Sequence, residues 1–161
     1  MSAGGGASPA AGPGAAVALP DRTLTGHVLV AGRAAGSALV CTAPISGWGG
    51  IDPATGTITE ITHPQRGASF TGRILVMPGA KGSSGWSGQF HLARVMGTAP
   101  VAVVTRSVNS KLAVGLVALQ VPAIQLDDLD AFVSDGTVLP VSEVTVAGGR
   151  VHVRYSPSSG G

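Results

Sequence analysis

The chain has 161 residues and a formal net charge of +2, and only 11% of its residues are charged. This length suits one domain with a buried core, and a weak net charge without runs of Lys or Arg argues against a nucleic-acid partner. The single cysteine, Cys41, excludes a disulfide within the chain and, with four scattered histidines, a metal or iron–sulfur cluster built from this chain alone.

Both ends of the chain have the composition of flexible segments. Residues 1–20 are mostly Ala, Gly, Pro and Ser, without the regions of a signal peptide, and we expect a disordered tail. Residues 157–161 resemble it, which leaves 21–156 as a single domain. No apolar stretch approaches the ~20 residues that a membrane-spanning helix needs. Together with the cysteine usage, this predicts a cytoplasmic protein with no membrane partner.

The first half of the domain predicts short strands and loops. Residues 24–31 and 37–42 are rich in β-forming side chains and flank a turn at 32–36, so we expect an early strand pair. Residues 43–56 contain many Gly and Pro and predict an irregular loop. Residues 57–62 alternate in polarity and predict a further short strand.

The second half of the domain predicts strands that alternate with helices. Three apolar runs alternate with two segments of helical periodicity: 74–77, 86–96, 101–105, 110–119 and 121–126. This order predicts right-handed crossovers and parallel pairing, with Ser110 as a plausible helix cap. Residues 137–146 and 150–155 around Gly148-Gly149 predict a β-hairpin. The fold class is therefore α/β, with a small parallel core and flanking β-strands from both ends.

A glycine-rich turn follows the first apolar run and has the sequence Gly79-Ala80-Lys81-Gly82-Ser83-Ser84-Gly85. It delivers two serines to the predicted start of a helix. In a parallel sheet, ligands bind at the carboxyl ends of the strands, which is where this turn lies. Hydroxyl groups and unpaired backbone N–H groups at such a point can hold an anion or support proton transfer.

Four interpretations of the serine turn compete. Ser83 or Ser84 can simply cap the following helix. A nucleotide-binding P-loop does not match, because Lys81 precedes Gly82 instead of following it. A serine-hydrolase elbow does not match either, because the glycine after Ser84 comes one position early and no spacing supports a triad. A serine alkoxide acting as a general base is the fourth, with Lys81 as the nearest cation to lower the pKa of the hydroxyl.

Several segments spread over about residues 24–126 together carry a family pattern. They are Ile45-Ser46-Gly47-Trp48-Gly49-Gly50-Ile51-Asp52-Pro53-Ala54-Thr55-Gly56, then His63-Pro64, Gly67-Ala68-Ser69-Phe70-Thr71-Gly72-Arg73, Gly82-Ser83-Ser84, Ala99-Pro100 and Gly115. In combination they resemble the small, swivelling subunit of the aconitase X family, a family of dehydratases related to aconitase.

The resemblance implies a swivelling β/β/α domain that closes over a large partner subunit. This chain would bind no cofactor, the large aconitase X subunit would hold an iron–sulfur cluster, and the enzyme would be active only as the two-chain complex. By similarity, Ser83 is the catalytic proton acceptor, Ser84 is a substrate contact, and Gly82, Gly85 and Lys81 lie beside the substrate. Aconitase itself has an Arg directly after the serines, where this chain has Gly85, which argues against a tricarboxylate.

The resemblance also bounds the substrate, a small hydroxy acid that loses water by α,β-elimination. Family members dehydrate cis-3-hydroxy-L-proline or, in archaea, a phosphorylated mevalonate. The lack of an acidic, salt-adapted surface and the Ala/Gly-rich tail favour a bacterial enzyme, so we expect cis-3-hydroxy-L-proline. The alternatives are a phosphomevalonate dehydratase small subunit, a non-catalytic binding or scaffold module with the swivel fold, and an independent hydrolase.

The remaining candidate residues each have a structural and a functional interpretation. Asp52 lies in Asp-Pro, a turn dipeptide, and His63 before a proline is typical of a hydrogen-bonded loop. The functional alternative places both, with Trp48 and Gly49-Gly50, at the interface or cleft that faces the large subunit. Trp48 can be a core residue or a partner-facing hot spot. Cys41 on a strand predicts a buried, inert thiol.

Overall fold

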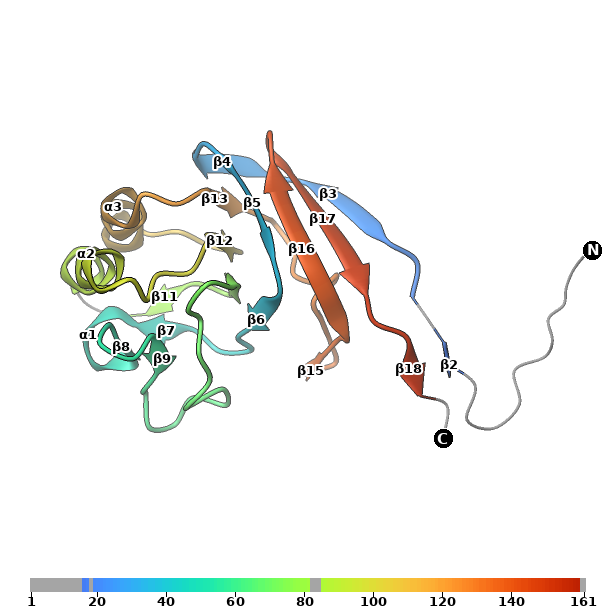
Figure 1. Ribbon diagram of the computed structural model, residues 1–161, viewed down its shortest axis with the longest axis horizontal. Helices are drawn as coiled ribbons and strands as arrows, with labels where there is room; N and C mark the ends of the chain where they lie inside the picture. Colours follow the sequence, from blue (N-terminus) through green and yellow to red (C-terminus); the bar gives the residue numbers. More distant parts are fainter. Residues whose placement is uncertain (1–15, 18, 82–84, 160–161) are drawn as a thin grey trace, which may run out of the picture.

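A computed structural model describes residues 16–17, 19–81 and 85–159. Figure 1 shows three layers: two helices on one side, a mostly parallel sheet in the middle and an antiparallel sheet on the other side. The middle sheet has five strands in the order β4-β13-β12-β10-β6, and the outer sheet has four in the order β3-β17-β16-β5.

The middle sheet is built from short strands. Four of them are mutually parallel and β4 is antiparallel to β13; their bounds are β4 (His27–Val30), β6 (Ala38–Val40), β10 (Ile74–Met77), β12 (Ala102–Thr105) and β13 (Ala123–Gln125). Every residue of β10 and β12 is buried, because helices cover one face and the second sheet covers the other. The predicted small parallel core, and with it the β/β/α fold class, is confirmed.

The two crossover helices have the predicted bounds, α2 (Trp86–Met96) and α3 (Ser110–Leu119). The cap of α3 differs from the prediction, because Asn109 and not Ser110 is the N-cap, and its side-chain oxygen accepts a hydrogen bond from Leu112 N at 2.8 Å. No helix in the described ranges is long and apolar enough to cross a bilayer.

The outer sheet is antiparallel and comes from both ends of the domain. Its strands are β3 (Arg22–Thr25), β5 (Arg33–Gly36), β16 (Val141–Ala147) and β17 (Arg150–Tyr155). The hairpin β16–β17 turns at Gly148 and Gly149, whose φ angles of 57° and 78° suit a two-residue turn. The predicted hairpin is therefore present, although β16 begins only at Val141.

The expected early strand pair is wrong. β3 and β5 pair with β17 and β16 in the outer sheet, whereas β4 and β6 pair with β13 and β10 in the middle sheet. The chain changes sheet at Gly26, where a Cβ atom would lie 2.4 Å from Gln125 O, and the predicted turn at 32–36 is mostly strand β5. Local composition identifies strands but carries no information about which distant strand each one pairs with.

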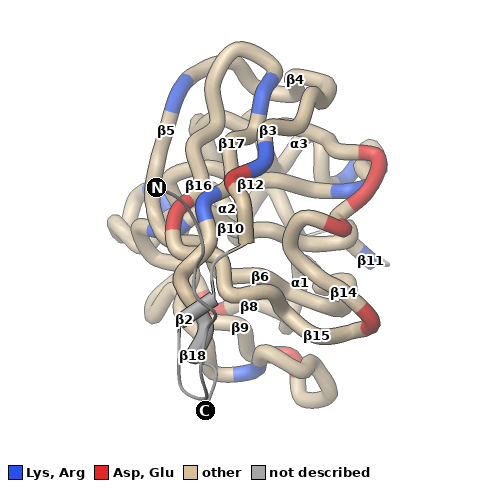
Figure 2. Tube along the Cα trace, turned by 90° about the vertical axis from the view of Figure 1, so that its right-hand side faces the viewer, with Lys and Arg blue, Asp and Glu red and all other residues tan. Residues whose placement is uncertain are grey.

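Several two-residue strands and one short helical turn complete the chain. They are β7 (Ile45–Ser46) with β11 (Ala80–Lys81), α1 (Gly47–Gly50), β8 (Ile51–Asp52) with β9 (Thr57–Ile58), β14 (Val133–Ser134) with β15 (Thr137–Val138), and β2 (Ala16–Val17) with β18 (Ser158–Ser159). The strand expected over 57–62 is thus only β9. Figure 2 shows that Lys and Arg are interspersed with Asp and Glu on the face in view.

Helices α2 and α3 touch at Gly115, where a Cβ atom would lie 2.8 Å from Trp86 Cβ and 3.1 Å from its carbonyl carbon. We predict that Gly115→Ala destabilises the domain by about 1–3 kcal/mol, because overpacking outweighs the gain in helix propensity. Urea unfolding of the isolated domain measures this. The matched control is Gly88→Ala on α2, where the added Cβ meets nothing within 4 Å and should stabilise by up to about 1 kcal/mol. Equal effects of the two changes would contradict the close approach.

Candidate active site

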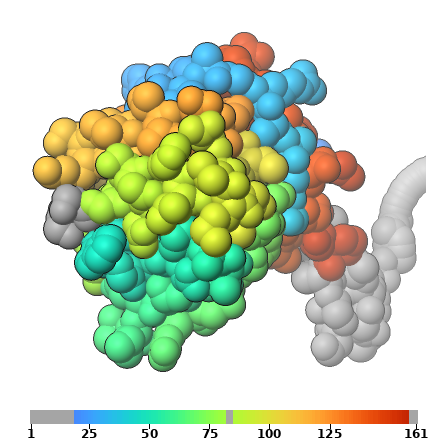
Figure 3. Space-filling view, turned by 60° about the vertical axis from the view of Figure 1, so that its left-hand side comes forward, coloured from blue at the N-terminus to red at the C-terminus, as the bar shows by residue number. Residues whose placement is uncertain are grey.

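The serine turn leaves the carboxyl edge of the parallel sheet at the end of β10. The chain continues through Pro78 and Gly79 into β11, and it enters α2 after Gly85. The predicted catalytic Ser83, with Gly82 and Ser84, lies outside the described residues, so the structure defines the site by its supports on either side. Figure 3 shows this side of the molecule, with the loop around α1 against α2 and with α3 above them.

The start of the turn is fixed to the end of the neighbouring strand β12. Arg106 N donates to Met77 O at 3.1 Å and Ser107 N donates to Pro78 O at 3.1 Å. Gly79 has a φ of 155°, and a Cβ atom there would lie 2.3 Å from Ser107 Oγ. Position 79 therefore requires glycine, and the chain leaves β10 along a path set by β12.

The next two residues form a small parallel ladder with the loop before α1. In β11, Ala80 pairs with Ile45 and Lys81 pairs with Ser46, and Ile45 N also donates to Gly79 O at 3.2 Å. Ile45 is fully buried, which fixes this ladder to the core. The turn is thus held by backbone hydrogen bonds up to Lys81.

Lys81 is also held through its side chain. Its ammonium forms an ion pair with Glu60, and the other oxygen of Glu60 accepts from Ser46 N at 2.9 Å. Partial burial alone would raise the pKa of Glu60, but the hydrogen bonds from Lys81 and Ser46 outweigh it and hold that pKa below its ordinary value. Glu60 therefore bridges both strands of the ladder, and the Lys81 charge is shared with a carboxylate.

On the far side of the turn, Gly85 is the N-cap of α2 and has a φ of 112°, with no side-chain cap hydrogen bond. A Cβ atom at Gly85 would lie 3.0 Å from both Trp48 N and Trp48 Cβ. The helix therefore begins after both serines, and the N-cap position is not a serine. The side chains of Ser83 and Ser84 lie outside the described residues, so the capping interpretation stays a prediction.

The loop of α1 lies directly over this helix start. A Cβ atom on Gly47 would lie 2.8 Å from the indole ring of Trp86, so the backbone can approach only as glycine. The next residue, Trp48, is 74% exposed beside Gly85. Gly49 has open space around it, whereas Gly50 is buried and a Cβ atom there would lie 3.2 Å from Glu60 Oε1. An exposed tryptophan at the edge of the serine turn has the character of a partner-facing residue.

Two of the predicted cleft residues have local structural contacts. Asp52 accepts hydrogen bonds from Ala54 N and Thr55 Oγ1, both at 2.9 Å, as a turn-forming residue does. His63 is 5% exposed, and its ring nitrogens pair with Ala43 O at 2.9 Å and Gln65 N at 3.0 Å. Both side chains thus have hydrogen-bond partners within or next to their own loops, and their place at an interface or cleft with the large subunit stays a prediction.

The described residues offer no donor set for a metal cluster. No group of three or more His, Cys, Asp or Glu side chains comes together in the described ranges. Burial raises the pKa of the Cys41 thiol to about 12, against a smaller opposing influence of Arg73, so this thiol stays protonated.

Comparison with known proteins identifies the class to which this fold and edge belong. The model of the aconitase X swivel domain matches residues 23–153, and the chain belongs to this family. The resemblance drawn from the sequence is confirmed.

Similar chains agree with this assignment. The phosphomevalonate dehydratase small subunit of Methanocella arvoryzae is 34% identical over 123 residues, which cover 71% of this chain and 93% of that one. That of Archaeoglobus fulgidus is 39% identical over 102 residues, covering 63% and 76%. The crystal structure of Thermococcus kodakaraensis aconitase X in its holo-form has a TM-score of 0.73 at 29% identity, covering 82% of this chain and 98% of that one.

Two residues of the edge were not identified from the sequence. Glu60 supports the turn from a distant loop, and Arg106 follows β12 with its backbone bonded to Met77 O. No spacing rule links either residue to the serines, because the contacts depend on strand order. The only sequence signal was that Arg106 directly follows an apolar run, at the carboxyl end of a predicted parallel strand.

We predict that Glu60→Gln lowers stability at neutral pH by a few tenths to about 1 kcal/mol, because Lys81 loses its partner while Ser46 N keeps an acceptor. Since the pKa of Glu60 is lowered in the folded state, its contribution is present above the ordinary value of 4.5 and is lost as the pH falls through the lowered value. Urea unfolding at pH 7 and below 4 measures both effects. The difference between wild type and variant should shrink at acid pH; a difference that grows there contradicts the ion pair.

Proposed function

We propose that this chain is the small subunit of a two-chain dehydratase of the aconitase X type and that Ser83 supplies its general base. The observation that carries the proposal is the serine turn of a family member, supported on both sides at the carboxyl edge of the parallel sheet. The ladder β7–β11 ends at Lys81, and α2 starts after Gly85. A swivel domain with such an edge is suited to close over a substrate that a second chain binds.

The reaction is a syn or anti loss of water across two neighbouring carbons. Ser83, as an alkoxide, takes a proton from the carbon next to the substrate carboxylate. The electron pair of that C–H bond forms the double bond, and the C–O bond breaks with its electron pair on the departing oxygen. The hydroxide so released and the proton held by Ser83 together account for one molecule of water. The backbone N–H groups of Ser84 and Gly85 stabilise the negative charge that develops on the carboxylate.

The iron–sulfur cluster expected for this class of enzyme does not fit the described residues of this chain. Cys41 is fully buried, and no cluster of His, Cys, Asp or Glu is present in the described part. A cluster would therefore belong to the large subunit. The part of the mechanism assigned to this chain is proton removal and charge stabilisation.

For the substrate, the relatives supply the support. The similar small subunits from Methanocella arvoryzae and Archaeoglobus fulgidus are named for phosphomevalonate, so phosphomevalonate is the first substrate to assay. The cis-3-hydroxy-L-proline expected from the sequence has no support among these relatives and stays a prediction. Both molecules are hydroxy acids, and the proton that Ser83 removes is next to a carboxylate in either one.

The rival functions differ in what the isolated chain does. A scaffold module would bind the large subunit without any dependence of turnover on Ser83. A hydrolase would show esterase activity without a partner. The exposed Trp48 beside Gly85 supports a partner chain at this edge, and the serine turn of the aconitase X pattern is what favours the dehydratase over the other two functions.

We predict that Ser83→Ala in the two-chain complex lowers kcat for phosphomevalonate dehydration by roughly 10²–10⁴-fold, the usual contribution of a general base, while the complex still assembles. Steady-state kinetics and size-exclusion chromatography measure the two properties. Ser142→Ala is the control, because Ser142 lies on β16 of the outer sheet and donates to Arg154 O at 3.1 Å. A Ser83→Ala complex as active as this control would remove Ser83 as the base.

A further inference from the structure

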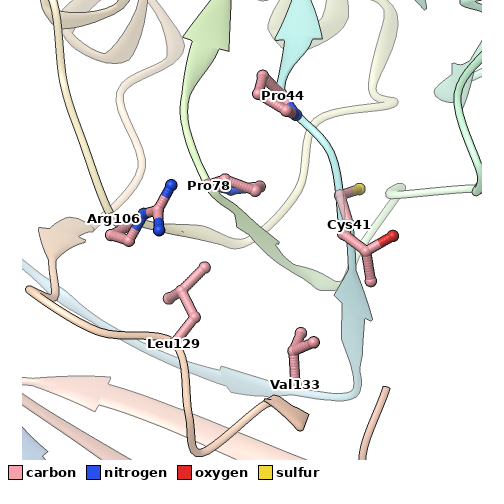
Figure 4. A pocket seen from close by; sticks show the side chains of 7 residues that line it. Cys41, Pro44, Pro78, Arg106, Leu129 and Val133 are labelled. Atoms are coloured by element: carbon pink, nitrogen blue, oxygen red, sulfur yellow. The ribbon is translucent and has the colours of Figure 1, made fainter. Parts of the chain in front are cut away.

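A cavity of about 220 Å³ opens at the same carboxyl edge as the serine turn, and neither the family match nor the relatives' names assign it a role. Figure 4 shows the side chains that surround it, with Arg106 facing across the cavity toward Cys41. The lining residues come from the ends of β6, β10 and β12 and from the segment after β13: Cys41, Thr42, Pro44, Pro78, Arg106, Leu129 and Val133.

The lining is mostly apolar and contains one charged group. Pro44, Pro78 and Leu129 offer aliphatic surface, Thr42 offers a hydroxyl, and Arg106 offers the only charge in the lining. The Thr42 backbone N–H and hydroxyl already contact Gln65 Oε1, at 2.9 and 3.3 Å, so Arg106 is the main polar group available to a ligand. Such a lining suits a small organic anion whose charged group meets the guanidinium.

The size of the cavity limits the ligand. A volume of about 220 Å³ leaves room for a carboxylate or phosphate and a short aliphatic segment. A small hydroxy acid of the kind proposed as substrate has these parts.

Arg106 is held at the root of the serine turn. Its backbone N–H donates to Met77 O at 3.1 Å, and its carbonyl accepts from Gln125 Nε2 at 3.2 Å. Pro78, which lines the cavity, is bonded by both Ser107 N and Ser107 Oγ, at 3.1 and 3.0 Å. The cavity and the path of the serine turn therefore share one rigid support.

Arg106 can offer its positive charge to a ligand, whereas the charge of Lys81 is already paired with Glu60. Lys81 forms an ion pair with Glu60, but the guanidinium of Arg106 has no carboxylate partner within the described ranges. An exposed guanidinium at the mouth of an apolar cavity binds a carboxylate or phosphate in a bidentate manner, which an ammonium cannot do.

We infer that this cavity is part of the substrate site and that Arg106 binds an oxyanion of the substrate, with the adjoining aliphatic segment against Pro44 and Pro78. The inference rests on the proposed dehydratase function. It assigns Arg106 the recognition of a small organic anion. The position directly after the serines cannot do this, because it is Gly85 and not an Arg.

The test uses the two-chain complex with Arg106→Met, Arg106→Lys and the control Arg150→Met, whose residue lies on β17 of the outer sheet. The first measurement is the thermal shift of each complex with inorganic phosphate or acetate, at matched ionic strength. The second is KM and kcat for phosphomevalonate. Arg106→Met should abolish the anion shift and raise KM at least about tenfold with a smaller change in kcat, and Arg106→Lys should recover part of both.

The two anions distinguish which group Arg106 binds. A shift by phosphate alone points to a phosphate, and a shift by acetate alone points to a carboxylate. Failure of the wild-type complex to shift with either anion overturns the inference, as does an Arg106→Met complex whose shift and KM equal those of Arg150→Met. A wild-type complex that shows the Arg106-dependent anion shift but dehydrates neither phosphomevalonate nor cis-3-hydroxy-L-proline contradicts the proposed function and still supports the anion site.

Discussion

Trp86 is held between two glycines, and the arrangement of the candidate site depends on this packing. The side chain is fully buried, with the backbone of Gly47 against its indole ring and Gly115 against its Cβ, each position leaving only 2.8 Å for an added Cβ atom. Its ring also contacts Phe90, with the centroids 4.8 Å apart. Because Trp86 is the first residue of α2, this packing fixes where the helix begins and therefore where the serine turn must end.

The start of the turn is fixed by a different mechanism, through hydrogen bonds and one ion pair. Gly79 passes close to Ser107, the ladder β7–β11 continues to Lys81, and Glu60 joins both strands of that ladder. Core packing on one side and polar contacts on the other give the turn two rigid ends. A catalytic base needs such support, because its reacting atom must be held in a fixed position relative to the substrate. The cavity beside Arg106 uses the same support.

The parts of this structure that follow from local sequence could be predicted, and the parts that follow from strand order could not. The bounds of α2 and α3 and the turn at Gly148-Gly149 come from periodicity and glycine placement, and they agree with the structure. The predicted pairing of residues 24–31 with 37–42 is wrong because each strand of these segments pairs with a strand far away in the chain. The family pattern located the serine turn, but the roles of Glu60 and Arg106 depend on contacts between loops that no local pattern records.

The central claim is that the large subunit covers the carboxyl edge of the parallel sheet, where the serine turn and Trp48 lie. Hydrogen–deuterium exchange of this chain, free and in the two-chain complex, tests it most directly. The account predicts that association slows exchange at residues 47–50 and 79–87, while the hairpin of β16 and β17 exchanges as in the free chain. Slowed exchange confined to that hairpin and its sheet, with the serine turn unchanged, would contradict it.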